Sequence, residues 1–370
     1  MRYLSAVILL ITLCTSCYVS EELPADQRAW EYDFPSNVGL NNSALYTLDN
    51  QIDSRNYAEI NGLIIIKDDK LVFENYYNGH TRSSLHPVGR ATTGVAALVL
   101  GLMIEQGLIA NLDIPISNYL PEYQNIFDTN PSKKNITFRH LLSNQMGVSW
   151  NEYTVNTERA ESDFYQMKLQ SDWAAYVLSQ NQEAPPGLRL VLNSGSSMLL
   201  SKIFESILID ITLEEFIDQE VFKPLNIVNY EWSYDPSGTL DLCTGLSIST
   251  LDFTRLGYLM LNEGRWTDKR RVINRDWILD CTIAQTPFLE DLDFGYFWWV
   301  FSDQFNSIYT NNNEAFWITG YRGESIYVVP EEKLVITVMA NNPYSNIVYN
   351  QSMNVYLKII DALNFSEQDS

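Results

Sequence analysis

The chain has 370 residues, of which 46% are hydrophobic and 13% aromatic, and its formal net charge is −22. This length and hydrophobic content suffice for one large domain or two closely packed ones, and they exclude an intrinsically disordered chain. The negative charge excludes nucleic acid as an expected partner and disfavours anionic lipid surfaces, because both are negatively charged and would repel the protein.

The first residues are typical of an export signal. Arg2 supplies positive charge, residues 4–13 are a short apolar run, and small residues lead to Cys17. The apolar run is about half of the roughly 20 residues that a membrane-spanning helix needs. We expect residues 1–17 to be a lipoprotein-type signal peptide, with Cys17 lipidated and anchored to a bacterial membrane; simple secretion and an uncleaved anchor are the alternatives. The polar residues 18–50 are expected to form a tether, so the protein would lie in the cell envelope.

The patterns that follow predict strands at both ends of the chain and helices between them. Runs rich in β-formers at 62–66 and 71–76 flank a polar turn and predict a hairpin. Apolar residues recur at spacings of three and four from 93 to 107 and predict a buried helix. Further helices are predicted at 138–144, 171–180, 197–208, 213–222, 250–262 and about 346–363, and further strands at 294–301, 315–318, 325–329 and 334–340. This order predicts an α/β (α+β) domain over 51–365, in which an antiparallel sheet flanked by helices carries an all-helical insertion at about 115–290.

Several short strings of the chain resemble one protein family in their order and spacing. They are NGLIII at 61–66, PVGRATTGV at 87–95, EQGL at 105–108, YLPEY at 119–123, ITFRHLLS at 136–143, PG at 186–187, LNSG at 192–195, LDFTRLG at 251–257, NEGRW at 262–266, FGYFWW at 294–299 and GYRGE at 320–324. Together they resemble the class C beta-lactamase-like serine hydrolases, which include esterases related to penicillin-binding proteins and 6-aminohexanoate-dimer hydrolases. The resemblance covers roughly residues 55–365 and implies a serine beta-lactamase/transpeptidase-like fold.

The resemblance also implies a catalytic apparatus that this chain lacks. Enzymes of that family attack an ester or amide carbonyl with a serine, which is activated by a lysine three residues later and by a tyrosine. The matching strings place Arg90, Thr93 and Leu192 at these three positions. No lysine of the chain has a serine three residues before it, and no G-x-S-x-G motif is present. We therefore expect a non-catalytic envelope protein that binds a ligand or partner; the alternative is a divergent ester or amide hydrolase with a non-standard nucleophile such as Thr92 or Thr93.

The altered cleft suggests what such a protein binds. Arg90 is expected at a helix N-terminus, and Arg322 is expected on the strand side of the same cleft. The positive end of a helix and two guanidinium groups would together attract a negatively charged ligand, so a small anionic or carboxylate ligand is expected. The alternative is that Arg90 pairs with a nearby acid and fills the cleft. The candidate ligand-binding residues are Arg90, Thr92, Asn193, Ser194, Thr319, Tyr321 and Arg322.

Three further expectations concern residue types that often carry chemistry. Thr92 or Thr93 is expected to cap the helix through its hydroxyl. No metal and no cofactor are expected, because metal-ligand spacing is absent from the histidines and from the cysteines beyond the signal peptide, which are His80, His86, His140, Cys243 and Cys281. The aromatic residues between 298 and 321 indicate either a packed strand face or the wall of a cleft.

Overall fold

The computed structural model of the chain describes residues 30–57, 59–152, 157–267, 270–310, 312–342 and 351–363. The predicted signal peptide and the lipidation site Cys17 lie outside these residues. In the part of the chain that the structure describes, no helix has the length and apolar character needed to cross a membrane.

A nine-stranded sheet in the order β1-β3-β2-β14-β13-β12-β11-β10-β9 forms the centre of the fold. Its neighbouring strands pair antiparallel, except that β1 pairs parallel with β3. The strands are β1 (Glu31–Tyr32), β2 (Ile60–Lys67), β3 (Lys70–Tyr76), β9 (Thr286–Leu289), β10 (Leu292–Phe294), β11 (Trp299–Phe301), β12 (Phe316–Thr319), β13 (Ser325–Val329) and β14 (Leu334–Ala340). Every residue of β2 and β14 is buried, as expected of central strands that helices cover on both faces.

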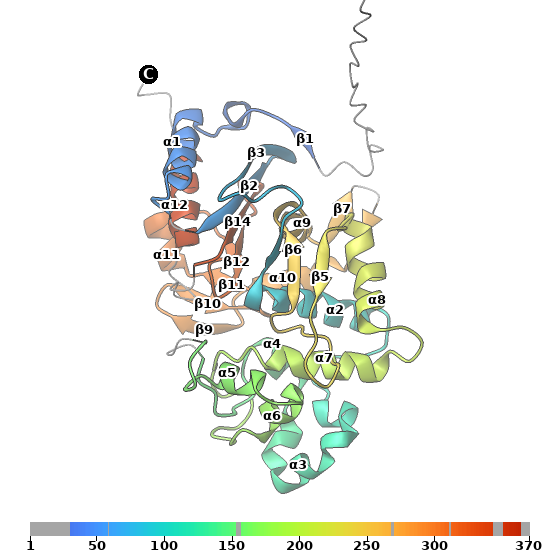
Figure 1. Cartoon of the computed structure of the whole chain (residues 1–370). Coiled ribbons are helices and arrows are strands. Elements are labelled where there is room, and N and C mark those ends of the chain that lie inside the picture. The colour runs from blue at the N-terminus through green and yellow to red at the C-terminus, as the bar shows by residue number, and fades with distance from the viewer. Residues whose placement is uncertain are drawn as a thin grey trace, which may run out of the picture.

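Helices from both ends and from the middle of the chain cover this sheet. Helix α9 (Thr250–Leu261) packs on β13, β14 and β2. Helices α1 (Asn42–Asp53) and α12 (Gln351–Leu363) lie side by side, and α12 packs on β14 (Figure 1). The two ends of the folded chain therefore meet on one side of the sheet.

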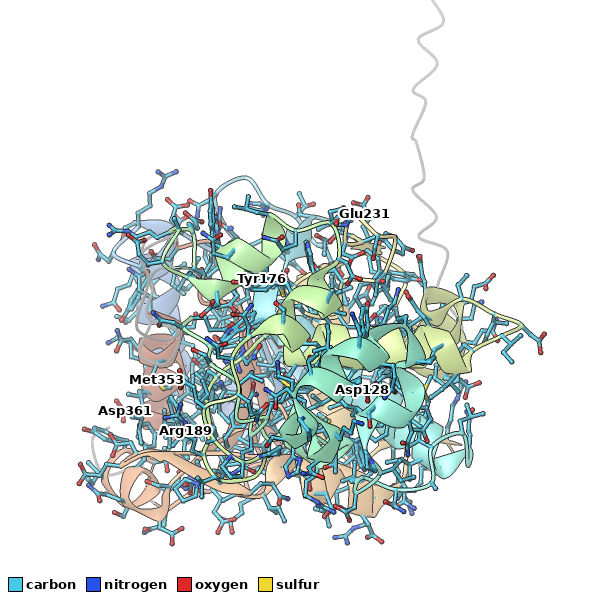
Figure 2. All side chains as sticks on the ribbon, turned by 90° about the horizontal axis from the view of Figure 1, so that it is seen from below. Asp128, Tyr176, Arg189, Glu231, Met353 and Asp361 are labelled. Atoms are coloured by element: carbon cyan, nitrogen blue, oxygen red, sulfur yellow. The ribbon has the colours of Figure 1, made fainter. Side chains whose placement is uncertain are left out.

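The remaining helices lie mostly below the sheet in Figure 1, but α8 stands at the height of the sheet, at its right. They are α2 (Thr93–Glu105), α3 (Gln124–Thr129), α4 (Phe138–Leu142), α5 (Asp163–Lys168), α6 (Trp173–Ser179), α7 (Ser196–Ile207) and α8 (Leu213–Ile217), while α10 (Arg275–Thr282) and α11 (Asp303–Tyr309) follow later. Seen from below, α3 with Asp128 and α6 with Tyr176 face the viewer (Figure 2). Two small sheets complete the fold, one of β4 (Leu85–Pro87), β6 (Leu246–Ser249) and β5 (Tyr230–Trp232), the other of β7 (Arg265–Thr267) and β8 (Arg270–Arg271).

The predicted fold class is confirmed, because the sheet is mostly antiparallel and is flanked by helices. The predicted range of the helical insertion, about 115–290, is too wide at its C-terminal end. Strands β5 to β8 lie within that range, and α9 packs on the main sheet instead of on the inserted helices. The apolar spacing of a helix is the same whichever layer it packs on, so the sequence pattern did not reveal this boundary.

The predicted tether over 18–50 is wrong for the part of it that the structure describes, which begins at Trp30. Strand β1 pairs with β3, and α1 buries Leu45, Leu48 and Ile52. These three residues recur at spacings of three and four, which is the helical pattern itself. Helix α1 is polar on its other face, and this made the segment resemble a solvated linker.

The predicted strand at 294–301 is two strands joined by a tight turn. Strand β10 ends at Phe294 and β11 begins at Trp299. The backbone N–H of Gly295 donates to the carbonyl of Trp298 at 2.8 Å, and Phe297 has a left-handed φ of 63°. Turn residues are usually polar, but those of this turn are buried aromatics. The sequence therefore shows one continuous apolar run and gives no signal of a turn.

Replacing Gly101 with alanine should destabilise the protein by about 1–3 kcal/mol, because the side chain would enter a filled core. A Cβ at Gly101 would lie 2.3 Å from Nε1 of Trp277, whose indole donates to the carbonyl of Ala97. The direction of this stability change is informative, because without a clash alanine would stabilise the helix relative to glycine by about 1 kcal/mol. Urea unfolding measures the change, with the exposed Lys358→Ala in α12 as a control; unchanged or increased stability would contradict the predicted clash.

Candidate functional site

Arg90 lies in a short 3-10 turn, Gly89–Thr92, that runs directly into α2. Its side chain is only 4% exposed. The guanidinium carbon lies 5.9 Å from the ring centroid of Phe294 and 5.8 Å from that of Trp299, within the range of cation–π attraction. The position that the resemblance assigns to a serine therefore holds a buried cation.

A buried carboxylate, Glu152, collects hydrogen bonds beside Arg90. Its Oε1 accepts from Ser194 Oγ at 2.6 Å and from Tyr321 OH at 3.1 Å. Its Oε2 accepts from Trp150 Nε1 at 2.6 Å and from Ser194 N at 3.0 Å. Nε of Arg90 lies 3.9 Å from Oε1, at the outer limit of an ion pair. Four donors and one cation compensate the burial of this carboxylate, and we call the five residues the Glu152 cluster.

Tyr321 contributes to the Glu152 cluster from the strand side of the site. It belongs to the turn Gly320–Glu324 that follows β12, and its ring contacts Phe164 at a centroid distance of 5.2 Å. Its OH also lies 2.6 Å from Ser194 Oγ. Burial, and next the nearby Glu152 carboxylate, raises the pKa of Tyr321 well above its usual value. The residue is therefore a neutral phenol that donates a hydrogen bond and does not serve as a base.

Two buried side chains at the site keep unused hydrogen-bonding atoms. Among the described residues, Nε and Nη1 of Arg90 and both side-chain polar atoms of Asn193 have no hydrogen-bond partner. The backbone N–H of Asn193 donates to Oδ1 of Asn144 at 2.8 Å, which anchors the segment before α7. Buried donors without partners cost free energy, so these atoms are the ones that a polar ligand would satisfy.

The hydroxyl of Thr92 is engaged in backbone bonds and does not cap α2. Its Oγ1 donates to the carbonyl of Gly89 at 2.7 Å and accepts from the N–H of Leu246 at 3.4 Å. The expected helix cap by Thr92 or Thr93 is therefore wrong. A capping residue needs an extended backbone, whereas Thr92 already has the helical φ of −53° and ψ of −31°, because the 3-10 turn continues into the helix.

The other candidate residues lie around the cluster without joining it. Oγ1 of Thr319 bonds Oγ of Ser325 at 2.8 Å. Arg322 is half-exposed, and its guanidinium donates to Oε1 of Glu158 and Oδ1 of Asn341, both at 2.7 Å. Leu192 is a buried core residue and brings no hydroxyl. Of the seven ligand-binding candidates, the structure thus brings only Arg90, Ser194 and Tyr321 to Glu152.

Glu152 itself was missed by sequence reasoning. A buried arginine does imply a buried acid, since an unpaired charge is costly to bury. The chain has 46 acidic residues, however, and no periodic pattern or motif distinguishes this one. Glu152 follows an irregular segment after α4, so only the tertiary structure brings it to Arg90.

A second buried carboxyl, Glu324, supports the turn that carries Tyr321. Its Oε2 accepts from the N–H of Arg322 at 3.0 Å, and its carbonyl accepts from the N–H of Gly320 at 2.8 Å. A Cβ at Gly320 would lie 2.3 Å from this Oε2 and 2.4 Å from the carbonyl oxygen of Val88, so the turn requires glycine here. Burial raises the pKa of Glu324 to about 7. The support of Tyr321 therefore includes a group that titrates near neutral pH.

The histidines, Cys243 and Cys281 lie outside the Glu152 cluster. Among the described residues, no group of three or more histidine, cysteine or acidic side chains is arranged to hold a metal ion. Cys243 and Cys281 are both free and buried. Trp299 and Trp317 are stacked and buried, so this part of the aromatic run between 298 and 321 is a packed strand face, whereas Tyr321 lies at the Glu152 cluster.

Comparison with known proteins agrees with this fold. The family model described as Beta-lactamase matches residues 55–352. The chain is similar to EstCE1, "a hydrolase with promiscuous acyltransferase activity", with 16% identity, a TM-score of 0.68 and coverage of 87% of this chain and 98% of that one. It is also similar to an octameric penicillin-binding protein homologue from Pyrococcus abyssi (17%, TM-score 0.65, coverage 87% and 76%). A class C beta lactamase from Rhodobacter sphaeroides is similar as well (17%, TM-score 0.61, coverage 87% and 98%). No curated protein sequence matches the chain.

Proposed function

The chain belongs to the beta-lactamase family, and from this premise we propose that it is a non-catalytic member that works by binding a partner. The observation that carries the proposal is the Glu152 cluster, in which Arg90 occupies the position that the family resemblance assigns to the serine. A guanidinium stays protonated in proteins, so it is neither a nucleophile nor a base. With a signal peptide and a lipid on Cys17, such a binding protein would be held in the cell envelope.

The burial of the cluster supports this proposal. The side chains of Arg90 and Glu152 are 4% and 0% exposed. A reacting carbonyl must come within about 3–3.5 Å of its nucleophile, and side chains as buried as these two offer little access for that approach. The burial of this charged pair therefore favours a non-catalytic role for the start of α2.

The cluster weighs against the small carboxylate ligand that the sequence suggests. The unpaired Nε and Nη1 atoms of Arg90 favour such a ligand. An added carboxylate, however, would compete with Glu152, which lies 3.9 Å from Nε, and would have to enter a buried space. Calorimetric titration of succinate and of muropeptides should therefore give no binding to the wild type. If the wild type binds one of these ligands and Arg90→Gln does not, the anion site would be supported instead.

The purified protein should not be acylated and should not turn over family substrates. No covalent label from a fluorescent penicillin is expected, and hydrolysis of nitrocefin and p-nitrophenyl acetate should stay at the buffer rate. The physical reason is the missing nucleophile and base, whose loss costs about 10⁶-fold where it has been measured. Gel fluorescence and absorbance assays test this, with a class C beta-lactamase as positive control. Labelling or turnover above background would contradict the proposal.

A divergent hydrolase is the second candidate function, and the hydrogen bond of Ser194 to Glu152 favours it. The hydroxyl of Ser194 lies 2.6 Å from the carboxylate of Glu152, which is within reach for that carboxylate to accept its proton as a general base. Thr92 is less suited, because its hydroxyl already donates to the carbonyl of Gly89. Any turnover should then be lost in Ser194→Ala and retained in Thr93→Ala; loss in Thr93→Ala instead would assign the nucleophile to the start of α2.

A further inference from the structure

A surface groove of about 470 Å³ lies between the C-terminal end of α7, the loop to α8 and the turn from Tyr234 to Leu240. Helix α8 stands beside this end of α7 (Figure 1). Ser194 of the Glu152 cluster lies two residues before the other end of α7, whose 12 residues span roughly 18 Å. The groove is therefore a site of its own, and we call it the α7–α8 groove.

The walls of the α7–α8 groove are apolar and open to solvent. Leu208, Ile209 and Ile211 line it from the loop, and Tyr234 lines it from the opposite turn. Ile209 is 91% exposed and Tyr234 is 48% exposed. A single exposed apolar residue is ordinary on a protein surface, but a concave group of them with a polar rim is typical of a binding site.

The rim of the groove carries only negative charge. Glu205, Asp210, Glu214 and Glu215 line it, and no lysine or arginine does. Glu214 accepts from the hydroxyl of Tyr234, and Glu215 accepts from the N–H and hydroxyl of Thr212. Glu205 accepts from the N–H of Leu240, and burial raises its pKa although Lys202 lies near enough to lower it. These donors are neutral, so the charge of Asp210, Glu214 and Glu215 stays in place, whereas the charge of Lys202 partly offsets that of Glu205.

We propose that the α7–α8 groove binds a basic peptide segment of a partner protein. Lysine or arginine side chains of this segment would pair with the carboxylates of the rim, and a large apolar side chain would pack on Leu208 and Ile209. The net charge of −22 disfavours a second copy of this chain, an anionic membrane and nucleic acid as the occupant. The inference agrees with a binding function but does not require it, because the groove and the Glu152 cluster are separate.

The experiment measures binding of a fluorescent twelve-residue peptide of alternating lysine and leucine to the full chain by fluorescence anisotropy. Two further peptides are compared with it, one with glutamate in place of lysine and one with serine in place of leucine. The lysine–leucine peptide is expected to bind the wild type at least tenfold more tightly than either. Its affinity should fall at least tenfold in the double variant Ile209→Ser/Asp210→Asn, and it should weaken as salt is raised.

The control variant removes a matched pair of exposed side chains elsewhere, Ile308→Ser/Asp361→Asn, and should bind as the wild type does. Equal affinity for both double variants would show that the peptide follows only the overall acidity, and it would overturn the proposal. Undetectable binding of the lysine–leucine peptide would overturn it as well. The groove variants leave every residue of the Glu152 cluster in place, so Ile209→Ser/Asp210→Asn should behave as the wild type does in the labelling and turnover assays, and failure at the groove and failure at the Glu152 cluster are distinguishable.

Discussion

Replacing Glu152 with alanine should lower the free energy of unfolding by about 3–5 kcal/mol, because it leaves the guanidinium of Arg90 buried without a counter-charge. It also removes the acceptor of four hydrogen bonds, from Ser194, Tyr321 and Trp150. Urea unfolding followed by circular dichroism measures the change. Asp361→Ala, an exposed acid in α12, should stay within about 0.5 kcal/mol of the wild type.

A double-mutant cycle separates the Arg90–Glu152 pairing from simple damage to the core. Arg90→Met and Glu152→Gln each leave one charge of the pair buried, whereas the double variant leaves none. Residues in one charged cluster typically couple by about 0.5–3 kcal/mol, so the double variant should be more stable than the sum of the single effects by that amount. Additive effects, within about 0.5 kcal/mol, would mean that the two side chains act independently and that Arg90 does not depend on Glu152.

Stability should fall by roughly 3 kcal/mol as the pH rises from about 4.5 to about 7, through the single buried carboxyl of Glu324. Burial raises the pKa of this carboxyl from 4.5 to about 7. Between these values the folded protein keeps a proton that the unfolded chain has lost, so each unit of pH costs about 1.4 kcal/mol. Below this window both states are protonated, and above it both are ionised, so the contribution levels off.

The variant Glu324→Gln isolates this effect, because glutamine keeps an oxygen that can accept from the N–H of Arg322. Urea unfolding at pH 5 and pH 8 should give similar stability for the variant and the wild type at pH 5, and a clear advantage for the variant at pH 8. Comparing the two proteins removes the contribution of other titrating groups, such as Asp241 and Glu205, from the result. The exposed Glu231→Gln in β5 serves as control. A variant that tracks the wild type at both pH values would contradict the role of Glu324.

The local elements that the sequence predicts well are those with strong periodicity. Helix α2 was predicted at 93–107 and observed at Thr93–Glu105, because its apolar spacing and Gly107 mark both its core face and its end. The hairpin of β2 and β3 was predicted from two β-rich runs around a polar turn. The turn at 295–298 was missed for the opposite reason, since aromatic side chains in a turn resemble a continuous strand.

The fold class and the family are predictable from the amino-acid sequence, because they depend on local periodicity and on the order of short strings. The sequence also shows that no lysine follows a serine by three residues. It placed Arg90 at the start of the buried helix, but it did not reveal the partner of that arginine. Only the tertiary structure brings Glu152, Ser194 and Tyr321 together, from segments that are distant in the chain. The physical reason is that a buried charge demands a counter-charge in space, and nothing in local sequence says which of many acids will supply it.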